Sequence, residues 1–413
     1  MPGPRVVILN PFDPLWTEEG REARYPYLAR RLAEGGFHVT WVTSDWSHRH
    51  KRRRDRATIR GAAEALGVRV EFVDTLPYRK NTSLRRLRSH TRFSRDAVRV
   101  LEALSPDVVI ASSPPPAMAE QAVAAAHRLG AAAVVDVQDL WPEEFDRFWP
   151  RGLKWLNQVA FHGMVGAFRR ACRDADAVVG VAERYVEEAC RFGGPPHREV
   201  VHIGVDVHAF DEAAGRGENL LADEVREGRP ILFWGGTIAS GTDWSGAIDA
   251  VARLIPAHPS VLLAVLGTGS DAAAMQQNVR TRGLQEYVRF LGFRPYEVCA
   301  ALLRQSAVAL NAWVPQTAVA FPNRLFDFMA AGVPAVNSLA GEVARLVEAE
   351  RIGLNYPAGS AEAMADAFAR LLIAPDLRRD MGRRARRLAE ERFDRKVEYA
   401  RYLGLCETLA SRR

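Results

Sequence analysis

The chain has 413 residues, of which 48% are hydrophobic and 26% are charged, and its formal net charge is +6. These proportions are typical of a globular protein, and a prior of ~150 residues per domain predicts two or three domains. No apolar run approaches the ~20 residues that span a bilayer, and the apolar run near the N-terminus is too short for a signal peptide. Four well-separated cysteines with no CxxC pair argue against a disulfide framework or zinc site, so we expect a cytoplasmic protein.

The positive charge is concentrated in one early region. Residues 49–56 and 79–99 together carry 14 basic and 2 acidic residues, a net charge of +12, which leaves the rest of the chain at −6. Such a patch attracts anions, for example a phosphorylated substrate, an anionic lipid or a nucleic acid. The alternative is a solvated, arginine-rich surface without a partner.

The chain alternates short β-branched runs with helical stretches, a pattern typical of α/β layers with parallel sheets. In the first half we predict strands at residues 6–9, 38–43, 68–73, 107–111, 132–137, 177–181 and 200–203. Helical patterns lie between them, at residues 25–34, 96–104 and 117–129. A polar stretch after residue 210, ending at Gly228-Arg229-Pro230, has the composition of a linker.

The same pattern then starts again. We predict strands at residues 231–234, 261–266, 288–291, 307–311 and 335–337, and helices at 247–254, 296–304, 324–331, 361–372 and from about 377 to the end. This organisation predicts two doubly wound α/β domains in tandem. Ligands of such folds bind at the carboxyl ends of strands, and we expect a site between the domains.

Three stretches carry a resemblance to a known family: VVDVQDLWPE at 134–143, GVDVHAF at 204–210 and FPNRLFDFMAAGVP at 321–334. They resemble family-4 retaining glycosyltransferases of the GT-B fold, in particular the branch that contains O-antigen N-acetylfucosamine transferases. SSPPP at 112–116 is similar to the same branch. The resemblance covers nearly the whole chain.

The resemblance implies two Rossmann-like, doubly wound domains that face each other across a cleft. Residues 1–205 would form the acceptor-side domain and 206–390 the nucleotide-sugar domain. Residues 391–413 would form a C-terminal helix that packs back toward the N-terminal domain.

The segment from Pro322 to Gly332 predicts a phosphate site. Asn323 is a good N-cap for the apolar helix that follows, and a helix N-terminus offers N–H groups and a positive dipole end to a diphosphate. Asn323, Arg324 and Asp327 are three or four residues apart, so they lie on neighbouring parts of one helical face. The alternative is a capped surface helix with an Arg–Asp pair.

By resemblance, Asp327 matches the acid that holds the ribose hydroxyls, while Arg324 and Leu325 lie near the diphosphate. Resemblance also makes Gly235-Gly236-Thr237 the loop under the donor phosphates, with Gly267 in a similar strand-end loop, and places Phe293 beside the nucleobase. The implied co-substrate is a nucleotide-diphosphate sugar, with a UDP sugar favoured, and no cofactor or metal is expected.

The sequence departs from the family at three positions. Thr237 and Thr242 stand where many members have Arg and Lys, and Val319 stands where the first of two acids is usual. Arg324 and Arg294 are the cations left nearby to stabilise a departing phosphate, and such stabilisation is worth ~3 kcal/mol per donor.

Asp139 is the third candidate for the chemistry, after Arg324 and Arg294. It follows a predicted strand, where its carboxylate could orient the sugar or stabilise positive charge at the anomeric carbon. Alternatively it caps the turn before Pro142.

We interpret the DxD at Asp174–Asp176 as structural, so no metal site is predicted. HExxH, GxSxG and P-loop motifs are absent from the sequence.

On the acceptor side, Glu19 and Gly20 occupy the place of a flexible glycine motif in the family. Trp46, Arg52 and Arg53 belong to the basic region, where rings can stack on sugars and arginines can pair with phosphates. They predict an anionic or lipid-linked acceptor, or peripheral contact with the inner face of an anionic membrane. We expect no nucleic-acid partner.

The leading hypothesis is a retaining, metal-independent glycosyltransferase of bacterial glycan or natural-product biosynthesis. Its acceptor would be a lipid-linked glycan or a small molecule. One alternative keeps the fold but is a pseudo-glycosyltransferase or uses an unusual phosphorylated donor. The other is a non-catalytic nucleotide-binding or interaction protein.

Overall fold

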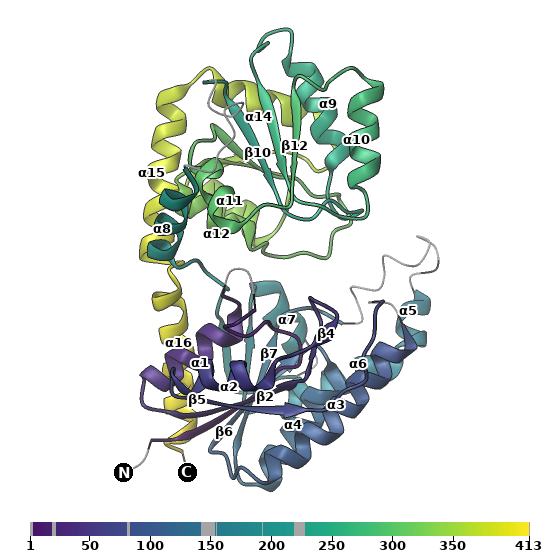
Figure 1. Ribbon diagram of the computed structural model, residues 1–413, viewed down its shortest axis with the longest axis vertical. Coiled ribbons are helices and arrows are strands. Elements are labelled where there is room, and N and C mark those ends of the chain that lie inside the picture. The colour runs from purple at the N-terminus through teal and green to yellow at the C-terminus, as the bar shows by residue number, and fades with distance from the viewer. Residues whose placement is uncertain are drawn as a thin grey trace. The chain divides into compact units, whose positions relative to one another are not determined.

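The computed structural model describes residues 3–18, 22–80, 83–141, 153, 155–191, 193–218 and 228–412. The chain forms two compact units (Figure 1). The N-terminal unit contains Met1–His202 together with Tyr399–Arg413, and the C-terminal unit contains Ile203–Glu398.

The N-terminal unit is built on a seven-stranded parallel sheet with the order β5-β2-β1-β6-β7-β8-β9. Its strands are β1 (Arg5–Leu9), β2 (His38–Ser44), β5 (Val68–Val73), β6 (Val108–Ser113), β7 (Ala132–Val137), β8 (Ala177–Gly180) and β9 (His197–Val200). A small hairpin pairs β3 (Trp46–Ser47) with β4 (Arg52–Arg53). Its helices are α1 (Arg24–Glu34), α2 (Arg56–Glu64), α3 (Leu84–Glu102), α4 (Pro116–Arg128), α5 (Trp155–Ala160), α6 (His162–Asp174) and α7 (Glu183–Cys190).

The C-terminal unit has a six-stranded parallel sheet with the order β12-β11-β10-β13-β14-β15. Its strands are β10 (Ile231–Gly235), β11 (Leu262–Leu266), β12 (Val288–Gly292), β13 (Val308–Asn311), β14 (Ala335–Asn337) and β15 (Gly353–Asn355). Its helices are α8 (Val207–Gly217), α9 (Trp244–Leu254), α10 (Ala272–Thr281), α11 (Tyr296–Arg304), α12 (Arg324–Ala331), α13 (Glu342–Ala349), α14 (Ala361–Leu372) and α15 (Pro375–Glu391).

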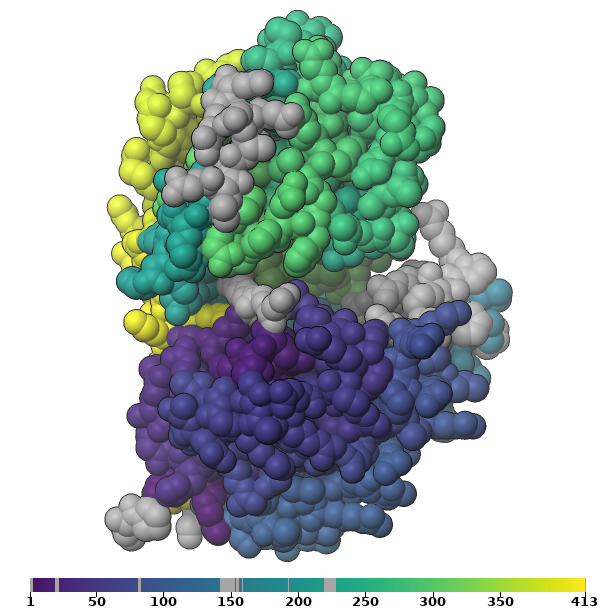
Figure 2. Space-filling view, in the orientation of Figure 1, coloured from purple at the N-terminus to yellow at the C-terminus, as the bar shows by residue number. Residues whose placement is uncertain are grey.

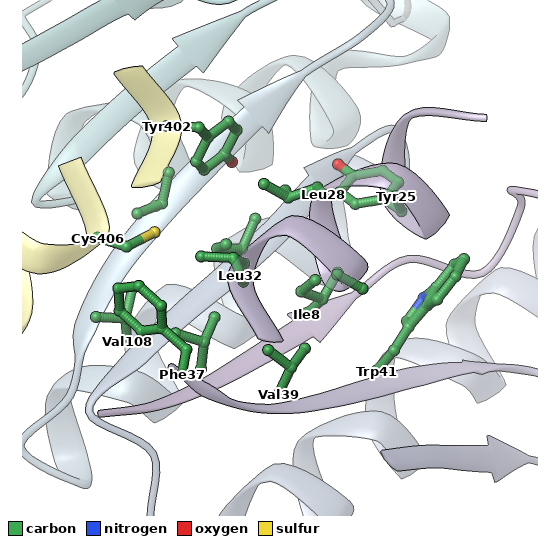
Figure 3. Close-up of a cluster of buried hydrophobic side chains, with 14 of the residues drawn as sticks. Ile8, Tyr25, Leu28, Leu32, Phe37, Val39, Trp41, Val108, Tyr402 and Cys406 are labelled. Atoms are coloured by element: carbon green, nitrogen blue, oxygen red, sulfur yellow. The ribbon is translucent and has the colours of Figure 1, made fainter. Parts of the chain in front are cut away.

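The last helix, α16 (Arg395–Ala410), contributes to the N-terminal core although it begins in the C-terminal unit. Tyr402 and Cys406 belong to the same buried cluster as Leu28 and Leu32 of α1 (Figure 3). All four side chains are fully buried. Removing such side chains typically costs 2–5 kcal/mol each, so the core of the first unit depends on the last helix of the chain.

A buried ion pair joins the start of α1 to strand β7. The Arg24 Nε donates to Asp136 Oδ2 at 2.9 Å and its Nη2 to Oδ1 at 3.1 Å, and both side chains are at most 1% exposed. Nη1 donates to the Val201 carbonyl at 2.8 Å. Burial alone lowers the pKa of the Arg24 guanidinium, but the Asp136 carboxylate outweighs it, and the pKa lies well above its usual value. Arg24 is therefore a paired, structural cation.

The helix predictions differ from the structure at several places, and α10 and α13 were not predicted. At two further places polar residues hid an apolar stripe. Helix α3 begins at Leu84, where Ser83 accepts a hydrogen bond from the Arg86 N–H at 3.3 Å, and it buries Phe93 and Leu101 beneath an arginine-rich face. Helix α8 occupies part of the stretch that we predicted to be a linker, and its apolar face includes Phe210.

The strand predictions failed at the edges of the sheets. Strand β9 lies at 197–200 rather than 200–203, and β3, β4 and β15 were not predicted. These strands have two to four residues each, too few for a periodic pattern to show.

In each sheet the chain starts in the middle, runs outward and then returns to the other side. The strand order reverses between the neighbouring strands β10 and β13 in the C-terminal sheet, and between β1 and β6 in the N-terminal sheet. The carboxyl ends of strands at such a switch point form the ligand-binding crevice of doubly wound folds. Among the described residues, no helix combines the length and apolarity needed to cross a membrane.

Candidate functional site

The loops after β10, β11 and β12 are joined through their main chains. The Gly236 N–H donates to the Leu266 carbonyl at 2.9 Å, and the Gly267 N–H donates to the Gly292 carbonyl at 2.8 Å. Gly236 and Gly267 have φ values of +124° and +139°, and a Cβ at Gly267 would lie 1.9 Å from the Gly236 oxygen. Only glycine fits at Gly267, so the predicted donor loop has an open backbone next to the switch point.

Arg324, the first residue of α12, directs its guanidinium at this loop. A Cβ placed on Gly236 would lie 3.4 Å from Arg324 Nη2. The guanidinium carbon also lies 4.7 Å from the centre of the Trp313 ring. The structure therefore brings together three predicted site residues, Gly236, Gly267 and Arg324, from three separate segments.

No described residue forms an ion pair or hydrogen bond with the Arg324 side chain, and its Nη1 is buried without a partner. Burial lowers the pKa of the guanidinium to about 10. A buried charge without a counter-ion is costly, and an anion beside it would remove much of that cost. The arrangement has the electrostatics of an anion-binding site.

The N-terminus of α12 differs from the prediction. Asn323 already has helical backbone angles, and its side chain makes no capping hydrogen bond, so the predicted N-cap role is wrong. The Leu325 N–H donates to the Pro322 carbonyl at 3.0 Å, and the Leu325 side chain is fully buried. Leu325 therefore serves the core rather than a ligand. Across the part of the chain that the structure describes, the Asn323 and Arg324 N–H groups have no acceptor.

Asp327, the predicted ribose ligand, lies one turn after Arg324. Its Oδ1 accepts a hydrogen bond from the Tyr296 hydroxyl at 2.9 Å. Tyr296 begins α11, which follows the β12 loop. The bond fixes the carboxylate beside the donor loops, and a carboxylate can accept further hydrogen bonds.

Of the other predicted donor-side residues, Gly235 is half-buried at the end of β10 and the rest are exposed. Phe293 is 73% exposed in the turn after β12, and Arg294 and Thr237 are exposed as well. No described contact joins Arg294 to the glycine loop. Of the two cations that we predicted for the leaving group, only Arg324 has a position that supports the role.

Sequence reasoning missed Trp313 and the asparagine at the end of β13, Asn311. Trp313 Nε1 donates to Asn311 Oδ1 at 2.7 Å, and both side chains are buried. The available signal was that β13, β14 and β15 all end in Asn.

On the N-terminal unit, Asp139 lies exposed at the carboxyl end of β7. Its carboxylate interacts electrostatically with Arg86 of α3. Pro142, on which the capping alternative depends, is outside the described residues.

The two acids of the DxD, Asp174 and Asp176, each have a partner. Asp174 pairs with Arg173 at 2.7 Å, and Asp176 lies 3.1 Å from His127. Within the described ranges, no group of three or more His, Cys, Asp or Glu side chains could hold a metal ion.

The structure divides the basic region into paired and unpaired cations. Arg53 pairs with Asp45, and Arg54 is buried 3.4 Å from Glu18. Arg52, opposite Ser47 in the β3–β4 hairpin, is exposed and has no ion pair among the described residues. The segment that carries these residues lies on the violet and blue surface in Figure 2. Glu19 and Gly20 fall outside the described residues.

A cluster of rings lies beside this basic region at the carboxyl edge of the first sheet. Tyr78 packs near the predicted acceptor residue Trp46, with ring centres 6.2 Å apart. The Tyr78 hydroxyl lies 2.7 Å from His48 Nδ1. Burial, together with Lys51 and two arginines, lowers the pKa of His48 to about 3, so its imidazole is neutral near pH 7. This edge presents aromatic faces and polar tips rather than metal ligands.

Comparison with known proteins agrees with this geometry. The family model for glycosyltransferase family 4 matches residues 22–209, and the model for glycosyl transferases group 1 matches residues 221–388. The structure of HepE from Anabaena in complex with UDP has a TM-score of 0.69 and 16% identity, over 98% of this chain and 100% of that one. Sucrose-phosphate synthase from Thermosynechococcus elongatus has a TM-score of 0.72 and 16% identity, over 99% and 100%.

Curated relatives are similar over part of their length. A phosphatidyl-myo-inositol mannosyltransferase of Mycobacterium leprae is 28% identical over 62% of this chain and 65% of its own length. An alpha-D-kanosaminyltransferase of Streptomyces kanamyceticus is 24% identical over 55% and 59%. The matched region thus spans less than two thirds of these relatives.

The two parallel sheets and their solved neighbours define an α/β protein of the GT-B class. Within that class, the chain is similar to the family 4 and group 1 glycosyltransferases, whose models match its N-terminal and C-terminal parts respectively.

Proposed function

We propose that this protein is a retaining, metal-independent glycosyltransferase that takes a sugar from a nucleotide-diphosphate donor. The observation that carries the proposal is the half-buried Arg324 guanidinium, whose Nη1 is buried without a partner, against the Gly236 backbone at the switch point of the C-terminal sheet. A cation in this position serves a phosphate group better than it serves the fold, because no acid among the described residues pairs with it.

In the proposed reaction, the bond from the anomeric carbon to the diphosphate oxygen breaks, and a bond from that carbon to the acceptor oxygen forms. The acceptor proton passes to the departing diphosphate, which leaves from the same face of the sugar. Negative charge grows on the diphosphate as it departs. A preorganised cation in a buried site stabilises that charge by ~3 kcal/mol.

The donor proposal extends to the ribose and the base. Asp327, held by Tyr296, is our proposed ribose ligand, and Phe293 is exposed where a base could contact it. UDP is our preferred nucleotide, and the UDP complex of HepE is consistent with that choice.

For the acceptor, a lipid-linked glycan and a small molecule both stay open: one relative is named for the lipid phosphatidyl-myo-inositol and another for the small molecule 2-deoxystreptamine. The unpaired Arg52, beside the ring cluster, supports an anionic acceptor. Asp139 is our proposed contact to the transferred sugar. The N-acetylfucosamine branch remains a prediction that only the product can test.

Calorimetric titration with UDP, GDP, ADP and dTDP tests the donor proposal. We expect the wild type to bind UDP, and Arg324→Met to weaken it by ~10-fold to 100-fold, because charge-assisted hydrogen bonds contribute ~1.5–3 kcal/mol. Arg294→Met is the matched control, since Arg294 is exposed, and it should bind as the wild type does. Absence of binding to every nucleotide would overturn the proposal.

A screen of nucleotide sugars with mass detection of the product then tests the reaction. The anomeric configuration of the product, read by NMR, tests retention. Undiminished turnover in excess EDTA is the expected result for a metal-independent enzyme.

A further inference from the structure

An unpaired guanidinium must be held by something other than an acid. At Arg324 that contact is Trp313, whose ring centre lies 4.7 Å from the guanidinium carbon. Trp313 is 9% exposed, and a cation over a desolvated indole gains up to ~2 kcal/mol. The position of the cation therefore depends on the position of this ring.

The ring is held by a chain of side-chain amides, the asparagine ladder, which consists of Asn311, Asn337 and Asn355. Trp313 Nε1 donates to Asn311 Oδ1 at 2.7 Å. Asn311 Nδ2 donates to Asn337 Oδ1 at 2.7 Å, and Asn337 Nδ2 donates to Asn355 Oδ1 at 2.8 Å. The last amide, Asn355 Nδ2, donates to the Ala344 carbonyl at 2.9 Å.

The hydrogen bonds orient every amide in the ladder. Because an indole N–H can only donate, Asn311 must turn its oxygen toward it, and its NH₂ then faces Asn337. The main chain orients Asn337 in the same sense, since its Oδ1 accepts from the Leu339 N–H at 3.1 Å and its Nδ2 donates to the Leu339 carbonyl at 2.9 Å. The ladder thus has one direction and holds the indole in one orientation.

The sheet makes the ladder possible. Asn311 pairs with Asn337, and Asn337 with Asn355, in the parallel register of β13, β14 and β15. Asn311 and Asn337 are 0% and 1% exposed. Buried amides destabilise a fold unless they are hydrogen-bonded, and here they are bonded to each other and to the indole.

The main chain of Trp313 is fixed as well. Its N–H donates to Ser338 Oγ at 2.8 Å, and Trp313 pairs with Thr242 in the loop that also carries Gly236. Hydrogen bonds therefore fix both the main chain of Trp313 and the N–H edge of its ring, next to the donor loop.

We infer that Trp313 and the asparagine ladder are positioning residues that keep the Arg324 guanidinium aimed at the glycine loop before any phosphate arrives. The inference rests on the proposed donor site. A cation held in the bound geometry avoids an ordering cost when the ligand binds, so the ladder raises diphosphate affinity without touching the ligand.

The experiment measures the affinities of full-length variants for UDP and for inorganic pyrophosphate. Trp313→Leu removes the ring and should weaken both by ~10-fold, whereas Trp313→Phe keeps a ring and should lose about threefold. Tyr287→Leu is the control. It removes a half-buried ring of the same unit that precedes β12, at the opposite end of that strand from the donor loops, and it should leave both affinities unchanged.

A double-mutant cycle separates positioning from a general structural role. If Trp313 acts through Arg324, Trp313→Leu has no further effect on UDP affinity in an Arg324→Met background. Equal effects of Trp313→Leu in both backgrounds would overturn the inference. If Trp313→Leu does not fold, Asn355→Ala at the far end of the ladder gives the same test, with an expected loss of about twofold.

The two proposals fail in different ways. A wild-type protein that binds neither probe would end the proposed donor site. A wild type that binds both, with Arg324→Met weakened and Trp313→Leu and Asn355→Ala unchanged, would overturn only the positioning role.

Discussion

The two units treat an arginine that is withdrawn from solvent in opposite ways: Arg24 is fully buried, and Arg324 is half-buried with its Nη1 buried. In the N-terminal unit, Arg24 is enclosed by Asp136 and the Val201 carbonyl, and its pKa is raised. In the C-terminal unit, Arg324 lies on a tryptophan face with no acid among the described residues, and its pKa is lowered to about 10. The first arginine is neutralised within the fold, whereas the second has no counter-ion among the described residues and is available to an anionic ligand.

Arg24→Met should have the largest effect on stability. It leaves Asp136 charged, buried and unpaired, which typically costs 3–5 kcal/mol, so we expect a loss of about that size in urea unfolding. Arg5→Met removes an exposed pair with Asp107, whose side chains are 52% and 36% exposed. That control should cost less than ~1 kcal/mol. Equal losses in the two variants would break the comparison.

Arg324→Met should behave in the opposite way. Without ligand, its free energy of unfolding should equal that of the wild type or exceed it by ~1 kcal/mol, because the substitution removes a buried unpaired charge. With saturating UDP the order should reverse, since only the wild type gains the full binding energy. A loss of more than ~2 kcal/mol without ligand would show that Arg324 has a structural role.

Asp13 sharpens the comparison within the N-terminal unit. Burial raises its pKa to about 6, although its Oδ2 accepts a hydrogen bond from the Tyr25 N–H at 3.1 Å. The folded protein then binds this proton more tightly than the unfolded chain does, so the stability that Asp13 contributes is lost as the pH rises from about 4 to 6. We expect Asp13→Asn to gain ~1–2 kcal/mol relative to the wild type between pH 4 and pH 7.5, measured by urea unfolding. A constant difference across this range would contradict the prediction.

His48 should show a smaller effect of the opposite sign. Its pKa is lowered to about 3. The His48 imidazole is therefore protonated near pH 6.5 in the unfolded chain but stays neutral at that pH in the folded protein. The stability that His48 contributes is therefore present at pH 7 and falls as the pH drops toward 4. His48→Gln should reduce this acid sensitivity by ~1 kcal/mol, seen as a shallower decline of the urea midpoint between pH 7 and 4.5. An unchanged decline would mean that the imidazole is protonated in the folded protein.

The sequence carried most of the fold because the central strands have strong apolar periodicity. The predictions for 68–73, 132–137 and 335–337 match β5, β7 and β14 to the residue. The failures lie where polar residues cover an apolar stripe, as in α3, or where a strand has only a few residues, as in β15.

The candidate site was predictable only in part. Arg324 could be chosen from its place in a helix that resembles the donor helix of the family. Two facts depend on the three-dimensional structure and not on sequence spacing: Arg324 faces Gly236 with no acid beside it among the described residues, and Arg294 is exposed to solvent. The asparagine ladder is likewise visible only once the register of β13, β14 and β15 is known.

Helix α16 has a consequence for how the protein is made. Tyr402 and Cys406 complete the core around Leu28 and Leu32, yet the ribosome adds them only after all of residues 203–398. Part of the apolar core of the first unit therefore stays exposed while the second unit is synthesised, and the second unit can fold first. We expect a chaperone that binds nascent chains to bind the N-terminal half of this polypeptide for longest.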